Sequence, residues 1–174
     1  GDIIPEVLCV KEHTGENQQY QYPENCPACN SKVVREEGEA AIRCVNPDCP
    51  AQLLRKLIHF CSRDAMDIEG MGESVCELLV NNSLISNPAD IYSLKTEDIE
   101  SLDRMGALSA SNLINAINKS KENDVSKLIF ALGIRHIGQK AAKLLASRFG
   151  TLPEIMKASF EDIFLIDGFG EIMA

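Results

Sequence analysis

Four of the seven cysteines stand in two closely spaced pairs, Cys26 with Cys29 and Cys44 with Cys49. Fourteen residues separate the two pairs. Pairs of this kind present four thiolates tetrahedrally to one soft divalent ion, and zinc is the usual occupant. Because protein ligands would fill all four positions, no coordination site stays open for water, and we expect the zinc to be structural.

Two other interpretations of these cysteines are weaker. Two disulfides are disfavoured because Cys9, Cys61 and Cys76 are left over, and three spare thiols are typical of a reducing compartment. A redox C-x-x-C site is disfavoured because no alternation of strand and helix patterns surrounds the pair. We therefore expect a cytoplasmic protein that carries a zinc site.

A second chemical feature is a five-residue glycine motif that occurs four times. In its fullest form it reads apolar-x-Gly-apolar-Gly, as at residues 166–170, and the other copies occupy 68–72, 102–106 and 134–138. The copies start 34, 32 and 32 residues apart, which indicates an internal repeat. The glycines concerned are Gly70 and Gly72, Gly106, Gly138, and Gly168 and Gly170.

A glycine turn that opens a helix is suited to binding an anion. Glycine lets the backbone adopt positive φ and approach a ligand closely. The N–H groups of the first helical turn point at that ligand with a favourable dipole, and a phosphate oxygen is the natural occupant. His136 stands where Gly70 and Gly168 stand in their copies, so it must tolerate a strained turn and is placed to face the phosphate. The alternative is a helical solenoid in which the glycines only make turns.

Helices must position these turns. Each copy has an apolar residue three positions before it and a small residue four positions after its last glycine, with leucine at plus seven in three copies. This periodicity predicts a helix-hairpin-helix motif. The apolar pattern at 52–60 predicts an amphipathic helix that leads into the first copy, and residues 32–43 predict a small β-hairpin between the cysteine pairs. Thr151 and Ser159 are expected as helix caps.

The expected fold is mainly α. A short β segment at residues 1–10 and a polar linker come first, then a four-cysteine finger, then four tandem helix-hairpin-helix motifs in two pairs with a boundary near residue 122. With no methionine at the start and the last motif cut four residues into its second helix, we expect a fragment of a longer chain. No run of about 18 apolar residues is present, so no membrane contact is expected.

Charge distinguishes the four copies. The net charge of −9 argues against binding nucleic acid through a bulk positive field. Residues 123–150 contain five basic residues and one acidic residue, a local charge of +4, whereas residues 64–80 contain five acidic residues and no basic residue. We expect the third copy to be the principal phosphate contact and the second to be secondary. The residues expected there are Arg135, His136, Gly138, Lys140 and Lys143 in the third copy, and Arg104 and Gly106 in the second.

These motifs together resemble a known family. The finger with its Cys-Pro-x-Cys and C-x4-C, the segment at 65–72 reading Ala-Met-Asp-Ile-Glu-Gly-Met-Gly, and Ile137-Gly138 before a helix stand in the order found in bacterial NAD-dependent DNA ligases. The opening residues 1–5, Gly-Asp-Ile-Ile-Pro, fit the same C-terminal half. The resemblance covers the whole chain, and it implies the end of an OB-like domain at 1–23, the zinc finger at 24–51, and motif pairs at 52–121 and 122–174.

The resemblance implies a parent enzyme that seals nicks in DNA replication and repair. It would use NAD, with magnesium, to adenylate a lysine in a K-x-D-G motif, which this sequence does not contain; the nearest match, at 166–168, lacks the lysine. We therefore expect this fragment to bind nicked double-stranded DNA across the minor groove, beside the remaining domains of the ligase, and to bind neither NAD nor magnesium. The six motif glycines would carry the contacts.

Two other functions remain open at this stage. One is the helix-hairpin-helix region of an excision-repair nuclease, although no acidic cluster with metal-ligand spacing supports it. The other is a protein-interaction module, which the acidic composition favours.

Overall fold

The computed structural model describes residues 8–9, 11–12, 15, 20–35, 38, 40–46 and 49–174. The chain divides into two compact units, residues 1–46 and 47–174, and each is described by itself. Of the β segment expected at residues 1–10, only residues 8 and 9 are described, so that expectation lies outside the described part of the chain.

The first unit contains a small antiparallel sheet. Strand β1 (Val33–Arg35) pairs with β2 (Ile42–Cys44), so that Val33 lies opposite Cys44. Ahead of β1 the chain makes a tight turn in which the amide of Asn30 donates to the carbonyl of Cys26 at 2.8 Å and the amide of Cys26 donates to Ser31. The β-hairpin predicted between the cysteine pairs is confirmed, and it places Cys44 at the end of a strand.

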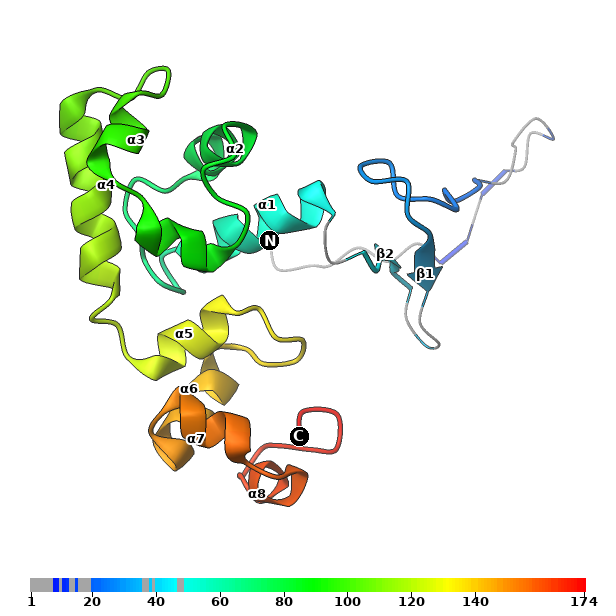
Figure 1. Ribbon diagram of the computed structural model, residues 1–174. Coiled ribbons are helices and arrows are strands. Elements are labelled where there is room, and N and C mark those ends of the chain that lie inside the picture. The colour runs from blue at the N-terminus through cyan, green and yellow to red at the C-terminus, as the bar shows by residue number, and fades with distance from the viewer. Residues whose placement is uncertain are drawn as a thin grey trace. The chain divides into compact units, whose positions relative to one another are not determined.

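The second unit is helical, as expected (Figure 1). Its elements are α1 (Pro50–Cys61), α2 (Glu73–Asn81), the 3-10 helix η1 (Pro88–Ser93), α3 (Thr96–Glu100), α4 (Ala107–Ser120), α5 (Val125–Ala131), α6 (Gln139–Phe149), α7 (Leu152–Lys157) and α8 (Phe160–Phe164). The helix predicted at 52–60 is observed as α1. Among the described residues, no helix combines the length and the apolar character needed to cross a membrane.

Side-chain caps fix the starts of the short helices. Thr151 caps α7 by accepting from the amide of Glu154 at 3.4 Å. Ser159 caps α8 in a reciprocal box: its hydroxyl accepts from the amide of Asp162, and the carboxylate of Asp162 accepts from the amide of Ser159. Both predicted caps are confirmed. Such boxes satisfy amides that would otherwise have no partner at a helix start.

Two hydrophobic cores hold the helical unit together. The larger one gathers α1 to α4 around fully buried side chains such as Leu57, Leu79 and Ile99. The smaller one gathers α5, α6 and the segment after α8 around Ile129 and Leu145. Helix α5 takes part in both cores, because Ala131 belongs to the larger one and Ile129 to the smaller. The two cores therefore form one continuous unit.

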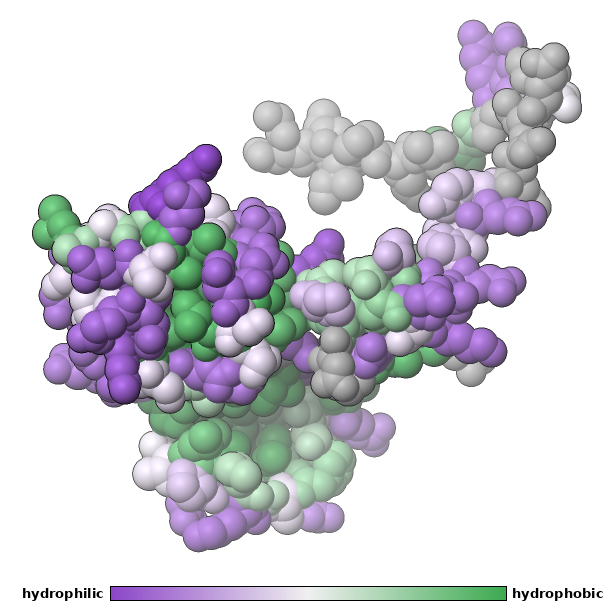
Figure 2. Space-filling model, turned by 45° about the horizontal axis from the view of Figure 1, so that its top comes forward, coloured by the Kyte–Doolittle hydropathy of each residue, from purple (hydrophilic) through white to green (hydrophobic). Residues whose placement is uncertain are grey.

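Some apolar side chains remain on the surface of the helical unit (Figure 2). Most of them lie from residue 132 onward, where the exposed ones are Leu132, Ile134, Met156, Phe160, Phe164, Leu165 and Ile172. After Gly170 the structure has turns at residues 171–173 and no assigned helix. The expectation of four helix-hairpin-helix motifs, the last of them truncated, therefore stays a prediction.

Candidate nucleic-acid interface and metal centre

The four paired cysteines converge. The Sγ atoms of Cys26, Cys29, Cys44 and Cys49 all lie within 4.8 Å of one another, and those of Cys29 and Cys44 are 3.5 Å apart. Tetrahedral zinc with Zn–S bonds of about 2.3 Å requires sulfur atoms roughly 3.8 Å apart. The donor set and its spacing fit zinc, and none of the described cysteines forms a disulfide.

The finger also favours the ionised form of one of these thiols. Hydrogen bonds from the side chain and backbone of Ser31 lower the pKa of Cys29 to about 6. Only the thiolate binds a metal ion, so a lowered pKa reduces the free energy needed to prepare the ligand. The Cys26 and Cys49 side chains are buried, which limits access of water to the cluster.

All four glycine motifs fold into the same turn. The third residue of each motif has positive φ: 86° at Gly70, 64° at Arg104, 65° at His136 and 89° at Gly168. The amide of the fourth residue donates to the carbonyl of the first in every copy, over 2.9 to 3.2 Å. The strained conformation expected at His136 is confirmed, and Arg104 shares it.

The last glycine of each motif begins the next helical turn. The amide four residues later donates to its carbonyl in each copy, at Cys76, Ala110, Ala142 and Ala174. Gly72, Gly106 and Gly138 are the N-caps of α2, α4 and α6, and none of these helices has a side-chain cap. Helices α5, α7 and α8, in contrast, are capped by Asp124, Thr151 and Ser159. The first-turn amides after the motif glycines have no side-chain acceptor.

The capping glycines are not required by the fold itself. Gly138 has φ −85° and ψ −178°, which any residue adopts, and a Cβ added there would meet no atom within 4 Å. Gly72, Gly106 and Gly170 are also open. The space in front of these glycines is therefore free for a ligand to approach the backbone.

The basic residues predicted for the third copy lie at or near the N-terminus of α6. Arg135 and His136 lie in the turn, Lys140 lies in the first turn of α6, and Lys143 follows one turn later; all four are exposed. The turn itself is more exposed than its sisters, because Ile134 is 50% exposed where Ile68 in the first copy is 3% exposed. In the second copy the Arg104 side chain is 93% exposed, and its Nε lies 3.7 Å from Oδ2 of Asp103.

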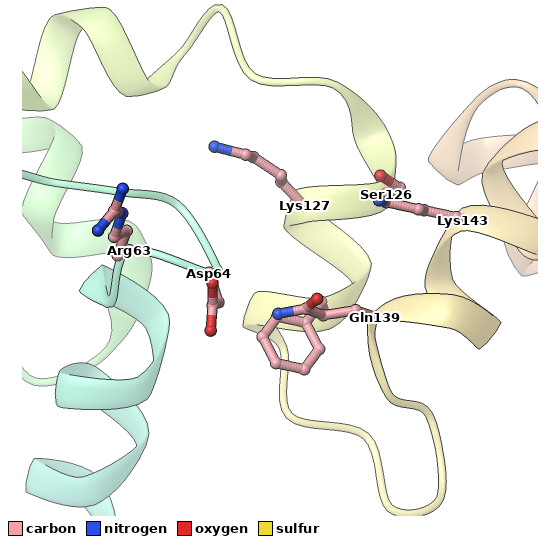
Figure 3. Close-up of a pocket in the computed structure, with 7 residues that line it drawn as sticks. Arg63, Asp64, Ser126, Lys127, Gln139 and Lys143 are labelled. Carbon is pink, nitrogen blue, oxygen red and sulfur yellow. The ribbon is translucent and has the colours of Figure 1, made fainter.

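Three further residues near this site were not predicted. Arg63, Lys127 and Gln139 line a cavity together with Lys143 (Figure 3). Lys127 is counted among the five basic residues of 123–150 but not as a site residue, and Arg63 directly precedes the acidic residues of the first copy. Sequence periodicity gave no sign that these distant segments meet.

Comparison with known families supports both parts of the site. Residues 25–51 match the NAD-dependent DNA ligase C4 zinc finger domain. Residues 62–119 match the SAM-like helix-hairpin-helix tandem, and residues 127–174 match the helix-hairpin-helix motif. The finger model includes all four clustered cysteines.

Similar curated proteins share one name. The chain is 52% identical to the DNA ligase of Clostridioides difficile (strain 630) and 51% identical to that of Bacillus subtilis (strain 168), each over 176 aligned residues. Each alignment covers 100% of this chain and 26% of the relative, so the chain spans about a quarter of the length of the relatives it matches. Over its full length the chain therefore corresponds to a segment of these DNA ligases, and this segment carries a zinc finger domain and helix-hairpin-helix modules.

Proposed function

We propose that this segment binds nicked double-stranded DNA and holds it in position for the rest of the ligase. The parent enzyme would join the nick in replication and repair, in the cytoplasm, using NAD and magnesium held by its other domains. The segment itself would bind neither cofactor. Its partners are the nicked duplex and the remaining ligase domains.

The observation that carries this proposal is that three helices have no side-chain cap and begin after a glycine with free space beside it. In α2, α4 and α6 the first-turn amides have no side-chain acceptor, and the preceding glycine leaves room for close approach. A phosphate oxygen satisfies such amides and interacts favourably with the helix dipole. Contacts of this kind go to the sugar-phosphate backbone, so they position the duplex without reading its sequence.

The four hairpins would contribute unequally. The third is the principal contact because Gly138 is accompanied by Arg135, His136, Lys140 and Lys143. The second is secondary, through Gly106 and Arg104. The first and the fourth, with Gly70, Gly72, Gly168 and Gly170, would contribute less, because Glu73 and Glu171 follow their last glycines and compete with a phosphate for the same amides.

Zinc would be held by Cys26, Cys29, Cys44 and Cys49 in a structural role. The cluster has four protein ligands, so it leaves no site for a reacting water. We assign the finger to residues 24–51, the first hairpin pair to 52–121 and the second to 122–174, with the end of an OB-like domain at 1–23.

Binding to a nicked duplex at two or more salt concentrations tests this function. If about four phosphates are neutralised, log K should fall against log salt with a slope of about −3.6. An intact duplex and a single strand of the same length serve as comparison ligands. A chain with no measurable affinity for nicked DNA at ~50 mM salt would leave the interaction-module alternative, which the net charge of −9 favours.

A further inference from the structure

A cavity of about 210 Å³ opens between the turn that follows α1 and the helices α5 and α6. Arg63 and Asp64 lie on one side of it, and Lys127, Gln139 and Lys143 lie on the other, with Lys127 extended toward the Arg63 side (Figure 3). Ser126 and Phe130 complete its wall. All seven residues belong to the helical unit, and they join its two hairpin pairs.

The cavity is basic although the protein is acidic. Three of the residues that line it, Arg63, Lys127 and Lys143, are positively charged, and one, Asp64, is negatively charged. Within the described part of the chain none of the three cations forms an ion pair, although Asp124 is near enough to Lys127 to interact with it electrostatically. Lys127 is half-buried. A partly desolvated cation without an ion pair favours binding of an anion.

The walls of the cavity are held in place by contacts between distant segments. The imidazole Nε2 of His59, on α1, donates to the carbonyl of Phe130, on α5, at 2.9 Å, and the two rings meet edge to face. The side-chain amide of Asn123 donates to the carbonyl of Met66 at 2.7 Å. These bonds connect residues 71 and 57 positions apart, so the two sides are ordered before any ligand binds.

We infer that this cavity binds a phosphate group of the same DNA strand that lies on the third hairpin. Helix α6 carries both sites: its start is capped by Gly138, and Gln139 and Lys143 reach the cavity from its first two turns. Guanidinium and ammonium groups bind phosphate oxygens by charge-assisted hydrogen bonds. The inference rests on the proposed function, and it adds a contact that links the two hairpin pairs through the DNA.

The test compares two double variants of equal charge. Arg63→Ala with Lys127→Ala removes two cations from the cavity, and Arg55→Ala with Lys119→Ala removes two exposed cations outside it. Loss of one phosphate contact should reduce the magnitude of the salt slope by about 0.9. We expect the cavity variant to bind a nicked duplex about tenfold more weakly at ~100 mM salt, and the control variant to lose less than threefold. Circular dichroism should show unchanged melting for both.

The possible results separate this inference from the function on which it rests. Equal losses in the two double variants, or none in the cavity variant, would refute the cavity as a site while the wild-type chain still binds DNA. Failure of the wild-type chain to bind would refute both. Inorganic phosphate, followed by amide chemical shifts at residues 63–64 and 126–130, provides a second arm: phosphate that binds but is not displaced by the duplex would assign the cavity to a free anion instead of DNA.

Discussion

The first and third hairpins have the same backbone and opposite surroundings. In both, the third residue has positive φ, the same turn hydrogen bond forms, and a glycine in extended conformation opens an uncapped helix. The first hairpin is followed by Glu73 and the third by Gln139 and Lys140. Geometry alone therefore does not distinguish a phosphate site from a turn that only packs.

Burial follows the same division. Ile68 in the first turn is 3% exposed and belongs to the larger core, whereas Ile134 in the third is 50% exposed. A buried turn stabilises the fold, and an exposed turn is available to a ligand. The comparison teaches that repeat copies can keep one conformation and still differ in how accessible they are to a ligand.

The largest expected effect is loss of the finger on removal of zinc. Structural zinc in small four-ligand sites contributes about 10–16 kcal/mol of apparent binding energy, so a strong chelator should unfold residues 26–49. Helix α1 begins at Pro50, directly after Cys49, and runs into the first hairpin. We expect hydrogen exchange to increase in the finger and the first turn of α1 and to stay unchanged in α6. Full protection of the finger after complete zinc removal would contradict this.

The next effect separates the two hairpins directly. Gly138→Val fills the space in front of the α6 amides without a clash inside the protein, because an added Cβ meets no atom within 4 Å. We expect at least a tenfold loss of affinity for nicked DNA and a melting temperature within a few degrees of wild type. Gly72→Val, the matched control, should lose less than twofold. Equal losses at the two positions would overturn the ranking of the hairpins.

The sequence predicted what depends on local periodicity. Four features follow from residues that are close together in the sequence. They are the register of the four turns, the positive φ at His136, the caps at Thr151 and Ser159, and the β-hairpin of the finger. The clustering of the cysteines followed from the preference of zinc for four thiolates.

Contacts between distant segments could not be predicted from the sequence. The bond from His59 to Phe130 and the bond from Asn123 to Met66 depend on how α5 packs against α1, and no spacing rule encodes that packing. The cavity at Arg63 and Lys127 depends on the same packing. The exposure of Ile134 was also missed, because its sequence position matches that of three buried residues.

Charge reversal beside the capping glycine tests the electrostatic half of the comparison. Lys140→Glu places an acid in the first turn of α6, where it competes with phosphate for the helix amides. We expect a loss of about five- to tenfold at ~100 mM salt, which shrinks as salt is raised because screening weakens the repulsion. Ser74→Glu places an acid at the same position of α2, with a charge change of one unit instead of two, and should alter affinity by less than twofold. A loss that is independent of salt would indicate a steric cause.

The smallest effect concerns His136, which holds the position of Gly70 with φ 65° instead of 86°. Replacing His136 with glycine relieves left-handed strain but increases the entropy of the unfolded chain by a similar amount, so stability should change by less than about 1 kcal/mol. If the exposed imidazole donates one hydrogen bond to the phosphate, His136→Gly should weaken binding about two- to threefold. His136→Asn is the matched control, because asparagine tolerates positive φ and keeps a donor. Wild-type affinity of both the glycine and the asparagine variant would show that the side chain only accommodates the turn. In that case the basic side chains of α6, which the first hairpin lacks, would account for the difference between the two copies, because both hairpins offer the same backbone amides.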